Sequence, residues 1–196
     1  LDFTTGLFTP DGRTVSIGLG RTTCSRGRAE TIKAKREHFG DDIHPGDILI
    51  TNDSYITGSH LNHVTLSLPI FQGDELVGWS CCMAHWLDIG GSLGGITTDI
   101  GSEGLQIPIL KLHDRGVPNE TLIDVIRMNM RLPSRAMGDL RAQITAVKTG
   151  ERRFLELVER YGRDQVLSAI KAIMDHSETM ARARTKSIPD GVYEAE

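Results

Sequence analysis

The chain has 196 residues, of which 39% are hydrophobic and 24% charged, with a formal net charge of -4. This length and composition suit one ordinary folded domain and exclude a disordered chain, which would carry fewer apolar residues and a larger net charge. Because the charge is spread without a basic block, and no apolar run approaches the roughly 20 residues that span a bilayer, we expect no nucleic-acid or membrane partner.

The first 53 residues predict strands around one helix. Residues 1–8 (LDFTTGLF) and 13–19 (RTVSIGL) predict a hairpin around a Pro-Asp-Gly turn. Residues 29–40 (AETIKAKREHFG) predict a helix that closes at its terminal glycine. Residues 47–51 predict a short buried strand.

An antiparallel hairpin is predicted next. Apolar residues alternate with small or polar ones over 64–69 and again over 77–83, which is the period of a strand. The residues QGDE between them supply a turn, so we expect a hairpin centred near Gly73. Paired positions then sum to about 146, twice the position of that glycine, which places residue 61 opposite residue 85.

The rest of the chain changes to a helical pattern. A glycine-rich loop (90–104) and a short apolar segment (105–112) precede helices predicted at 120–132, 138–162 and 164–184. We therefore predict an α+β fold. Its mixed β-sheet occupies the mainly strand and loop part, 1–118, and the part that follows, 119–187, is mainly helical. Because both ends of the sequence look cut, we expect 1–196 to be a single domain or a fragment of a longer subunit.

The cysteines favour a reducing compartment. Their number is odd, Cys24 stands alone, and Cys81 and Cys82 are adjacent. Neighbouring strand residues point to opposite faces, so we interpret Cys81 and Cys82 as small core residues. The first residues also lack the charged and apolar regions of a signal peptide, and we predict a cytoplasmic protein.

Four potential metal ligands gather at the open end of the predicted hairpin. His60 and His63 stand directly before its first strand, whereas His85 and Asp88 follow its second. Because His60 and His63 are an odd number of residues apart, their convergence needs a bend, which Gly58 permits. Three imidazoles and a carboxylate are a typical ligand set for zinc, manganese or iron, and a site with an open position can activate water or polarise a carbonyl.

The alternative for this cluster is structural. A single histidine at the rim of a sheet is more often a hydrogen-bonded polar group, and His85 with Asp88 could simply form a pair. We favour a metal because unpaired polar groups packed together are costly. Asp53, after the preceding strand, is a candidate catalytic or orienting carboxylate. Glu103 is a candidate base or substrate contact, with an ordinary surface carboxylate as its alternative.

Several ordered motifs resemble the hydantoinase B and oxoprolinase family, and together they cover most of the chain. They read GDILITNDSYITGSHLNHVTLSLPIF, AHWLDIGG, EGLQIPILKL, NMRLPSRAMGDLRAQITA and GERRFLELVERYG. The chain departs from the family pattern at Ser54, where proline is common, and at His63, where an aspartate ligand is expected. A histidine makes the ligand set softer, which favours zinc, with manganese also possible.

The resemblance implies the catalytic subunit of an ATP-dependent cyclic-amide hydrolase of the hydantoinase or oxoprolinase type. A hydantoinase A-type partner would use ATP to phosphorylate the substrate, and a metal-bound water held by His60, His63 and His85 would attack the activated carbon. We expect ATP on that partner, in a hetero-oligomer, because this chain lacks the Gly-x-x-x-x-Gly-Lys-Ser/Thr pattern. Two alternatives stay open: a subunit of an ATP-dependent ketone carboxylase of the acetone or acetophenone type, and a noncatalytic structural subunit.

Overall fold

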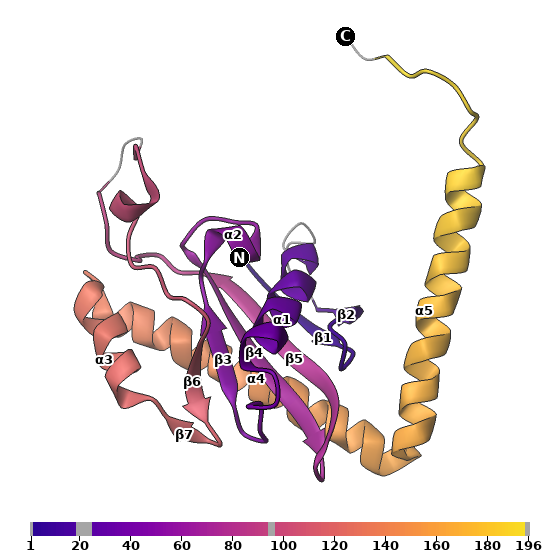
Figure 1. Cartoon of the computed structure of the whole chain (residues 1–196), viewed down its shortest axis with the longest axis horizontal. Coiled ribbons are helices and arrows are strands. Elements are labelled where there is room, and N and C mark those ends of the chain that lie inside the picture. The colour runs from indigo at the N-terminus through magenta and orange to yellow at the C-terminus, as the bar shows by residue number, and fades with distance from the viewer. Residues whose placement is uncertain (1, 19–24, 94–96, 195–196) are drawn as a thin grey trace. The chain divides into compact units, whose positions relative to one another are not determined.

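The computed structural model of the chain describes residues 2–18, 25–93 and 97–194 (Figure 1). Cys24 lies outside these residues. The chain forms two compact units, Leu1–Glu156 and Leu157–Glu196. None of the helices in the described part is both long and apolar enough to cross a membrane.

The described strands of the first unit form one seven-stranded sheet. Their bounds are β1 Phe3–Phe8, β2 Thr14–Ile17, β3 Ile48–Thr51, β4 His63–Gln72, β5 Glu75–His85, β6 Leu110–Asp114 and β7 Val117–Pro118. The strand order is β2-β1-β5-β4-β3-β6-β7. Every pairing is antiparallel, so the prediction of a mixed sheet was wrong. The reason is that three of the pairs are hairpins, whose short turns reverse the chain.

The turn of the predicted β4–β5 hairpin is confirmed. Gln72 pairs with Glu75 across it, so the hairpin turns at Gly73 and the residue that follows. Gly73 has a φ of 63°. A positive φ at the first central residue is what a type II′ turn requires, and glycine adopts it without steric cost.

The register of this hairpin differs from the prediction. The pairs next to the turn sum to 147 and not to 146, and an irregularity between Ile70 and Phe71 shifts the pairing by one more residue, so that His63, and not residue 61, lies opposite His85. A bulge of this kind places two residues of one strand against one of the other, and alternation of apolar residues alone does not reveal it. The shift brings two of the predicted ligands into direct cross-strand contact.

Helices cover both faces of the sheet (Figure 1). α1, Ser25–Phe39, packs on one face, and its Ile32 joins a buried cluster with Trp79 and Cys81. α4, Pro133–Tyr161, packs on the other, where its Gly150 lies directly over Ser80. Odd-numbered and even-numbered residues of β5 therefore face different helices, as the alternation of a strand requires. Cys81 and Cys82 are both buried, as predicted.

Lys35 is a charged residue that lies wholly buried between α1 and the sheet. Its Nζ donates to Leu49 O at 3.0 Å, to Thr65 O at 3.2 Å and to the Ser67 hydroxyl at 3.0 Å. Three acceptors match the three N–H groups of an ammonium. Burial nevertheless lowers the pKa of Lys35 to about 7. Lys35 thus joins α1 to β3 and β4 with a group that titrates near neutral pH.

The remaining helices, besides α1 and α4, are α2 Ser54–Thr57, the 3-10 helix η2 Ile100–Ser102, α3 Glu120–Asn129 and, in the second unit, α5 Arg163–Lys186. Two of them, α3 and α5, were predicted, whereas the short α2 and η2 were not. Gly40, with a φ of 53°, ends α1 as predicted. An antiparallel sheet combined with these helices confirms the α+β class.

Candidate metal centre

His60, His63 and His85 form a cluster of three imidazoles, called here the histidine triad. Their ring centroids lie 4.3 Å (His60–His63), 5.0 Å (His60–His85) and 5.2 Å (His63–His85) apart. His63 and His85 are cross-strand partners, so they share one face of the sheet. His60 precedes β4 in a turn where the His63 N–H donates to the His60 carbonyl. The chain leaves α2 through Gly58, whose φ of 68° provides the predicted bend.

Asp2 lies beside the histidine triad, although the sequence analysis did not identify it. β1 pairs with β5, and the His85 N–H donates to the Asp2 carbonyl at 2.9 Å. Asp2, His85 and His63 therefore form a row across three neighbouring chain segments. Asp2 Oδ1 lies 3.6 Å from His63 Nε2, close enough for an ion pair but too long for an ordinary hydrogen bond.

His63 is the buried member of the histidine triad, with 6% of its surface exposed. Its Nδ1 lies 2.5 Å from the Ser59 hydroxyl, whereas its Nε2 makes no hydrogen bond within the described part of the chain. Burial lowers the pKa of His63, and the neighbouring His60 lowers it further against the opposing effect of Asp2. A neutral imidazole with an unpartnered ring nitrogen is the form that binds a metal.

The histidine triad and Asp2 have the donor atoms of a transition-metal site without its assembled geometry. Across residues 2–18, 25–93 and 97–194, no group of three or more His, Cys, Asp or Glu side chains is arranged to hold a metal ion. One ring nitrogen of His60 instead lies 3.3 Å from the Asn62 side-chain oxygen. Three imidazoles and a carboxylate nevertheless fit a divalent transition metal by donor type, and the buried Nε2 of His63 makes no hydrogen bond among the described residues.

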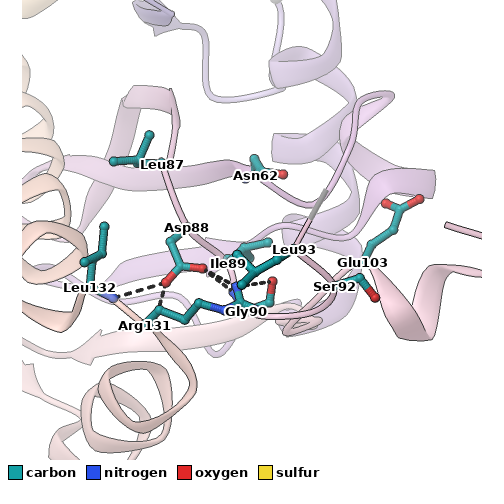
Figure 2. A pocket seen from close by; sticks show the side chains of 10 residues that line it. All are labelled: Asn62, Leu87, Asp88, Ile89, Gly90, Ser92, Leu93, Glu103, Arg131 and Leu132. Atoms are coloured by element: carbon teal, nitrogen blue, oxygen red, sulfur yellow. Dashed lines mark hydrogen bonds and ion pairs between the residues drawn. The ribbon is translucent and has the colours of Figure 1, made fainter. Parts of the chain in front are cut away.

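Asp88, the fourth predicted ligand, lies instead against the residues that precede α4 (Figure 2). Its Oδ1 accepts from the Gly90 N–H and from the Arg131 guanidinium, each at 3.0 Å. Its Oδ2 accepts from the backbone N–H groups of Arg131 and Leu132. Burial alone would raise the pKa of Asp88, but these donors outweigh it and hold the pKa below its usual value. The structure therefore gives this carboxylate four N–H partners and does not bring it to the histidine triad.

A buried amide of α4 holds the two strand ends that carry the histidine triad. Gln143 Nε2 donates to the Val64 carbonyl at 2.9 Å, and its Oε1 accepts from the Trp86 indole at 2.7 Å. Val64 directly follows His63, and Trp86 directly follows His85. The helical pattern predicted α4 but not which of its polar residues would turn inward.

A second buried amide holds the turn between His60 and His63. Asn52 Nδ2 donates to the carbonyls of Leu61 and Leu105, at 2.8 and 2.9 Å. Its side-chain oxygen accepts from the Ile107 N–H at 2.6 Å. Since Asn52 is fully buried, loss of any one of these bonds would leave a polar group without a partner.

The two predicted catalytic carboxylates, Asp53 and Glu103, lie on different elements of the fold. Asp53 caps α2, where its side chain accepts from the Tyr55 N–H at 2.9 Å. Glu103 follows η2 and accepts from the Thr97 hydroxyl at 3.2 Å. Glu103 lines two pockets: one of about 460 Å³ beside Asp88 (Figure 2), and one of about 530 Å³ that also includes His60.

Comparison with known proteins agrees with the fold and with the motifs. The family model for hydantoinase B/oxoprolinase matches residues 1–196. The caprolactamase subunit beta of Pseudomonas jessenii is 40% identical over 166 residues, which are 83% of this chain and 29% of that protein. The crystal structure of the ATP-dependent caprolactamase from Pseudomonas jessenii matches with a TM-score of 0.89 at 34% identity, over 97% of this chain and 34% of that one.

A more distant relative carries a different name. The acetophenone carboxylase delta subunit of Aromatoleum aromaticum is 26% identical over 197 residues, which are 98% of this chain and 29% of that protein. The chain thus spans about a third of the length of these relatives.

Proposed function

Because this chain belongs to the hydantoinase B/oxoprolinase family, we propose that it is the metal-bearing part of the catalytic subunit of an ATP-dependent cyclic-amide hydrolase. The observation that carries the proposal is the histidine triad, whose ring centroids lie within 5.2 Å of one another beside Asp2. The family and the 40% identical caprolactamase subunit support the choice of a cyclic amide as substrate.

The metal is proposed to be held by His60, His63, His85 and Asp2. Three imidazole donors favour zinc, with manganese as the second choice. When bound, a divalent metal supplies Lewis acidity toward a water molecule or a carbonyl oxygen. Within this chain, Gln143 fixes the strand ends that carry two of the imidazoles.

The other predicted carboxylates take different parts in this proposal. Asp88 fixes the loop after β5 through its four N–H partners. Asp53 fixes α2, next to the pocket that includes His60. Glu103, which lines that pocket, is the proposed substrate contact.

We propose that a hydantoinase A-type partner binds and uses the ATP, and that it forms a hetero-oligomer with the subunit that contains this chain. This sequence contains no Gly-x-x-x-x-Gly-Lys-Ser/Thr motif. The carbonyl carbon of an amide is a poor electrophile. Transfer of a phosphoryl group to the amide oxygen provides a good leaving group and so activates this carbon for attack by water. The caprolactamase that this chain resembles is described as ATP-dependent, and its related chain is a subunit named beta.

Ketone carboxylation is the second candidate function. It is supported by the acetophenone carboxylase delta subunit, which matches nearly the whole chain at 26% identity. The caprolactamase subunit matches at 40% identity, and this higher identity supports the amide hydrolase as the first candidate.

The experiment is an assay of the subunit that contains this chain, purified with its ATP-using partner. ATP-dependent ring opening of caprolactam or hydantoin is expected, with bicarbonate-dependent consumption of acetone or acetophenone as the competing outcome. His85→Ala should lower the hydrolysis rate by at least about 100-fold while the fold persists. The exposed His176 gives a matched control, His176→Ala, which should not change the rate. Full hydrolysis by His85→Ala would contradict the proposal, and unfolding of that variant would favour a structural role.

A further inference from the structure

The pocket beside His60 is formed by two separate chain segments. Residues around α2 form one wall, including Tyr55 and Ser59, and residues 97–100 with Glu103 form the other. Its volume is about 530 Å³, enough for a small ring compound. Tyr55 is 88% exposed, as expected of a side chain at a pocket mouth.

The carboxylates that line this pocket give it a negative charge. Its described lining includes the carboxylates of Asp99 and Glu103 and no lysine or arginine. The other polar side chains are those of Ser54, Tyr55, Ser59 and the two threonines, which carry hydroxyls, together with His60. A ligand anion would meet two carboxylates here without a lysine or arginine to balance its charge, whereas an N–H donor would meet acceptors.

The two carboxylates differ in the hydrogen bonds they already make. Asp99 caps η2, where its Oδ1 accepts from the Ser102 N–H at 3.0 Å, and its Oδ2 accepts from the Thr98 hydroxyl at 3.3 Å. Glu103 accepts through one oxygen, Oε1, from the Thr97 hydroxyl at 3.2 Å. In the described part of the chain no donor binds the other oxygen, Oε2, and Figure 2 shows this carboxylate turned away from the Asp88–Arg131 pair. Glu103 is therefore the carboxylate with acceptor capacity left for a ligand.

The Ser54 hydroxyl is a second group of this pocket whose hydrogen-bonding capacity is unused. Its oxygen is buried and has no hydrogen-bond partner among the described residues. A buried hydroxyl without a partner is costly, and a ligand with a hydrogen-bonding group would relieve that cost. The pocket thus combines an underused carboxylate, an unpartnered hydroxyl and an imidazole of the histidine triad.

We propose that this pocket receives the N–H side of a cyclic amide and that Glu103 determines specificity by accepting from that N–H and repelling substrates that carry a carboxylate. The proposal rests on the proposed function, because it assigns the substrate orientation at the same site. It narrows the substrate class to neutral lactams and hydantoins. Lactams with an acidic substituent on the ring are disfavoured by the like charge of Glu103 and Asp99.

Three ligands with the same five-membered ring test this assignment. Pyrrolidin-2-one is neutral and has the N–H, N-methylpyrrolidin-2-one lacks it, and 5-oxoproline adds a carboxylate. Their binding to the subunit that contains this chain is measured by NMR titration of the backbone amides of Tyr55, Ser59 and Thr97, without ATP or the ATP-using partner. Pyrrolidin-2-one should shift these amides, and the other two ligands should each bind at least about fivefold more weakly.

The variant Glu103→Gln separates charge from shape. It should raise the affinity for 5-oxoproline relative to that for pyrrolidin-2-one by at least about twofold, because the amide removes one of the two like charges and keeps an acceptor. Asp41→Asn, at an exposed carboxylate outside the pocket, should leave the preference unchanged.

Three results would overturn the proposal: no shift with pyrrolidin-2-one, equal binding of 5-oxoproline to the parent, or an unchanged preference in Glu103→Gln. Because the titration needs no turnover, its outcome is independent of the hydrolysis assay. Selective binding without ATP-dependent ring opening would contradict the proposed function alone, and ring opening without selective binding would contradict this inference alone.

Discussion

Trp86 donates its indole N–H to the side-chain oxygen of Gln143 at 2.7 Å, and the same glutamine donates to the Val64 carbonyl. One side chain of α4 thereby holds the residues that directly follow His85 and His63. All three groups are buried, so water cannot replace either bond. The geometry of the histidine triad consequently depends on a residue that does not contact it.

Replacing Gln143 by Leu should lower both the stability of the protein and its affinity for metal. The change leaves the buried Trp86 N–H without its acceptor and removes one donor from the Val64 carbonyl, at a cost of about 1–3 kcal/mol. Urea unfolding measures the stability, and a competition titration with a zinc chelator measures the affinity. Arg141→Gln, at an exposed position of the same helix, is the matched control and should change neither. Unchanged zinc affinity in a folded Gln143→Leu variant would show that the two strand ends hold their positions without it.

Asp88→Asn should destabilise the protein by about 1–3 kcal/mol without loss of bound metal. The asparagine retains one acceptor oxygen, but its NH₂ group would face N–H donors that the second carboxylate oxygen now satisfies. Thermal unfolding and metal content of the same samples check both parts. Loss of the metal at unchanged stability would restore Asp88 to the ligand set.

The same variant has a pH signature. The pKa of Asp88 is lower in the folded chain than its ordinary value of 3.8. The stabilisation is therefore complete above about pH 4 and is lost as the pH falls through the folded-state pKa. The parent should lose more stability than Asp88→Asn between pH 5 and pH 3. Parallel pH profiles of the two proteins would contradict this assignment.

Lys35 should make the stability of the protein rise with pH above neutrality. Its pKa is about 7 in the folded chain against 10.5 for the ordinary side chain, so between these values the unfolded chain binds the additional proton. Stability is then full above about pH 10.5, is lost as the pH falls toward 7, and stays level below that.

The measurement is urea unfolding at pH 7 and pH 9 for the parent and for Lys35→Met. The parent should gain about 2 kcal/mol more than the variant over this interval. Lys33→Met, at a partly exposed lysine on α1 that pairs with Glu30, should behave like the parent. An equal gain in all three proteins would mean that Lys35 stays protonated in the folded chain, held by its three acceptors.

Two glycines of α4 should respond in opposite ways to alanine. A Cβ at Gly150 would lie 2.2 Å from the Ser80 hydroxyl oxygen, whereas a Cβ at Gly138 would meet nothing within 4 Å. Gly138→Ala should stabilise the helix by about 1 kcal/mol, while Gly150→Ala should destabilise the protein by about 1–3 kcal/mol despite the same helix propensity.

Ser80→Ala supplies the control for this pair, because it removes the oxygen that Gly150→Ala would meet. The double variant should recover part of the loss, as thermal unfolding of all four proteins would show. A stabilising Gly150→Ala would mean that α4 moves away from β5 without cost.

The elements of this fold were predictable because local patterns determine them. Alternation over 64–69 and 77–83 predicted the β4–β5 hairpin, and Gly40 marked the end of α1. The relative direction of the strands in the sheet and the register of the hairpin could not be predicted from local patterns. The turn lies half a residue beyond Gly73, which moves the partner of His85 by one residue, and the irregularity between Ile70 and Phe71 moves it by one more. That irregularity leaves no trace in the apolar alternation.

In the candidate site, too, the residues placed by local patterns were predicted and those placed by distant contacts were not. His60, His63 and His85 were placed together from the hairpin alone, whereas Asp2 could not be, because its place depends on β1 lying beside β5 in the strand order. Asp88 was grouped with the histidines because it follows the second strand of the predicted hairpin, at its open end. Its actual donors come from Arg131 and Leu132, more than 40 residues later in the chain, and no local pattern links them.

The most direct test of the metal centre is elemental analysis of the purified protein and of the double variant His60→Ala, His85→Ala, with His176→Ala as the control. The account predicts close to one divalent metal ion per chain in the parent and the control, with zinc the most abundant, and none in a folded double variant. Equal metal content in the parent and the double variant, or no metal in the parent after zinc was supplied during purification, would contradict it.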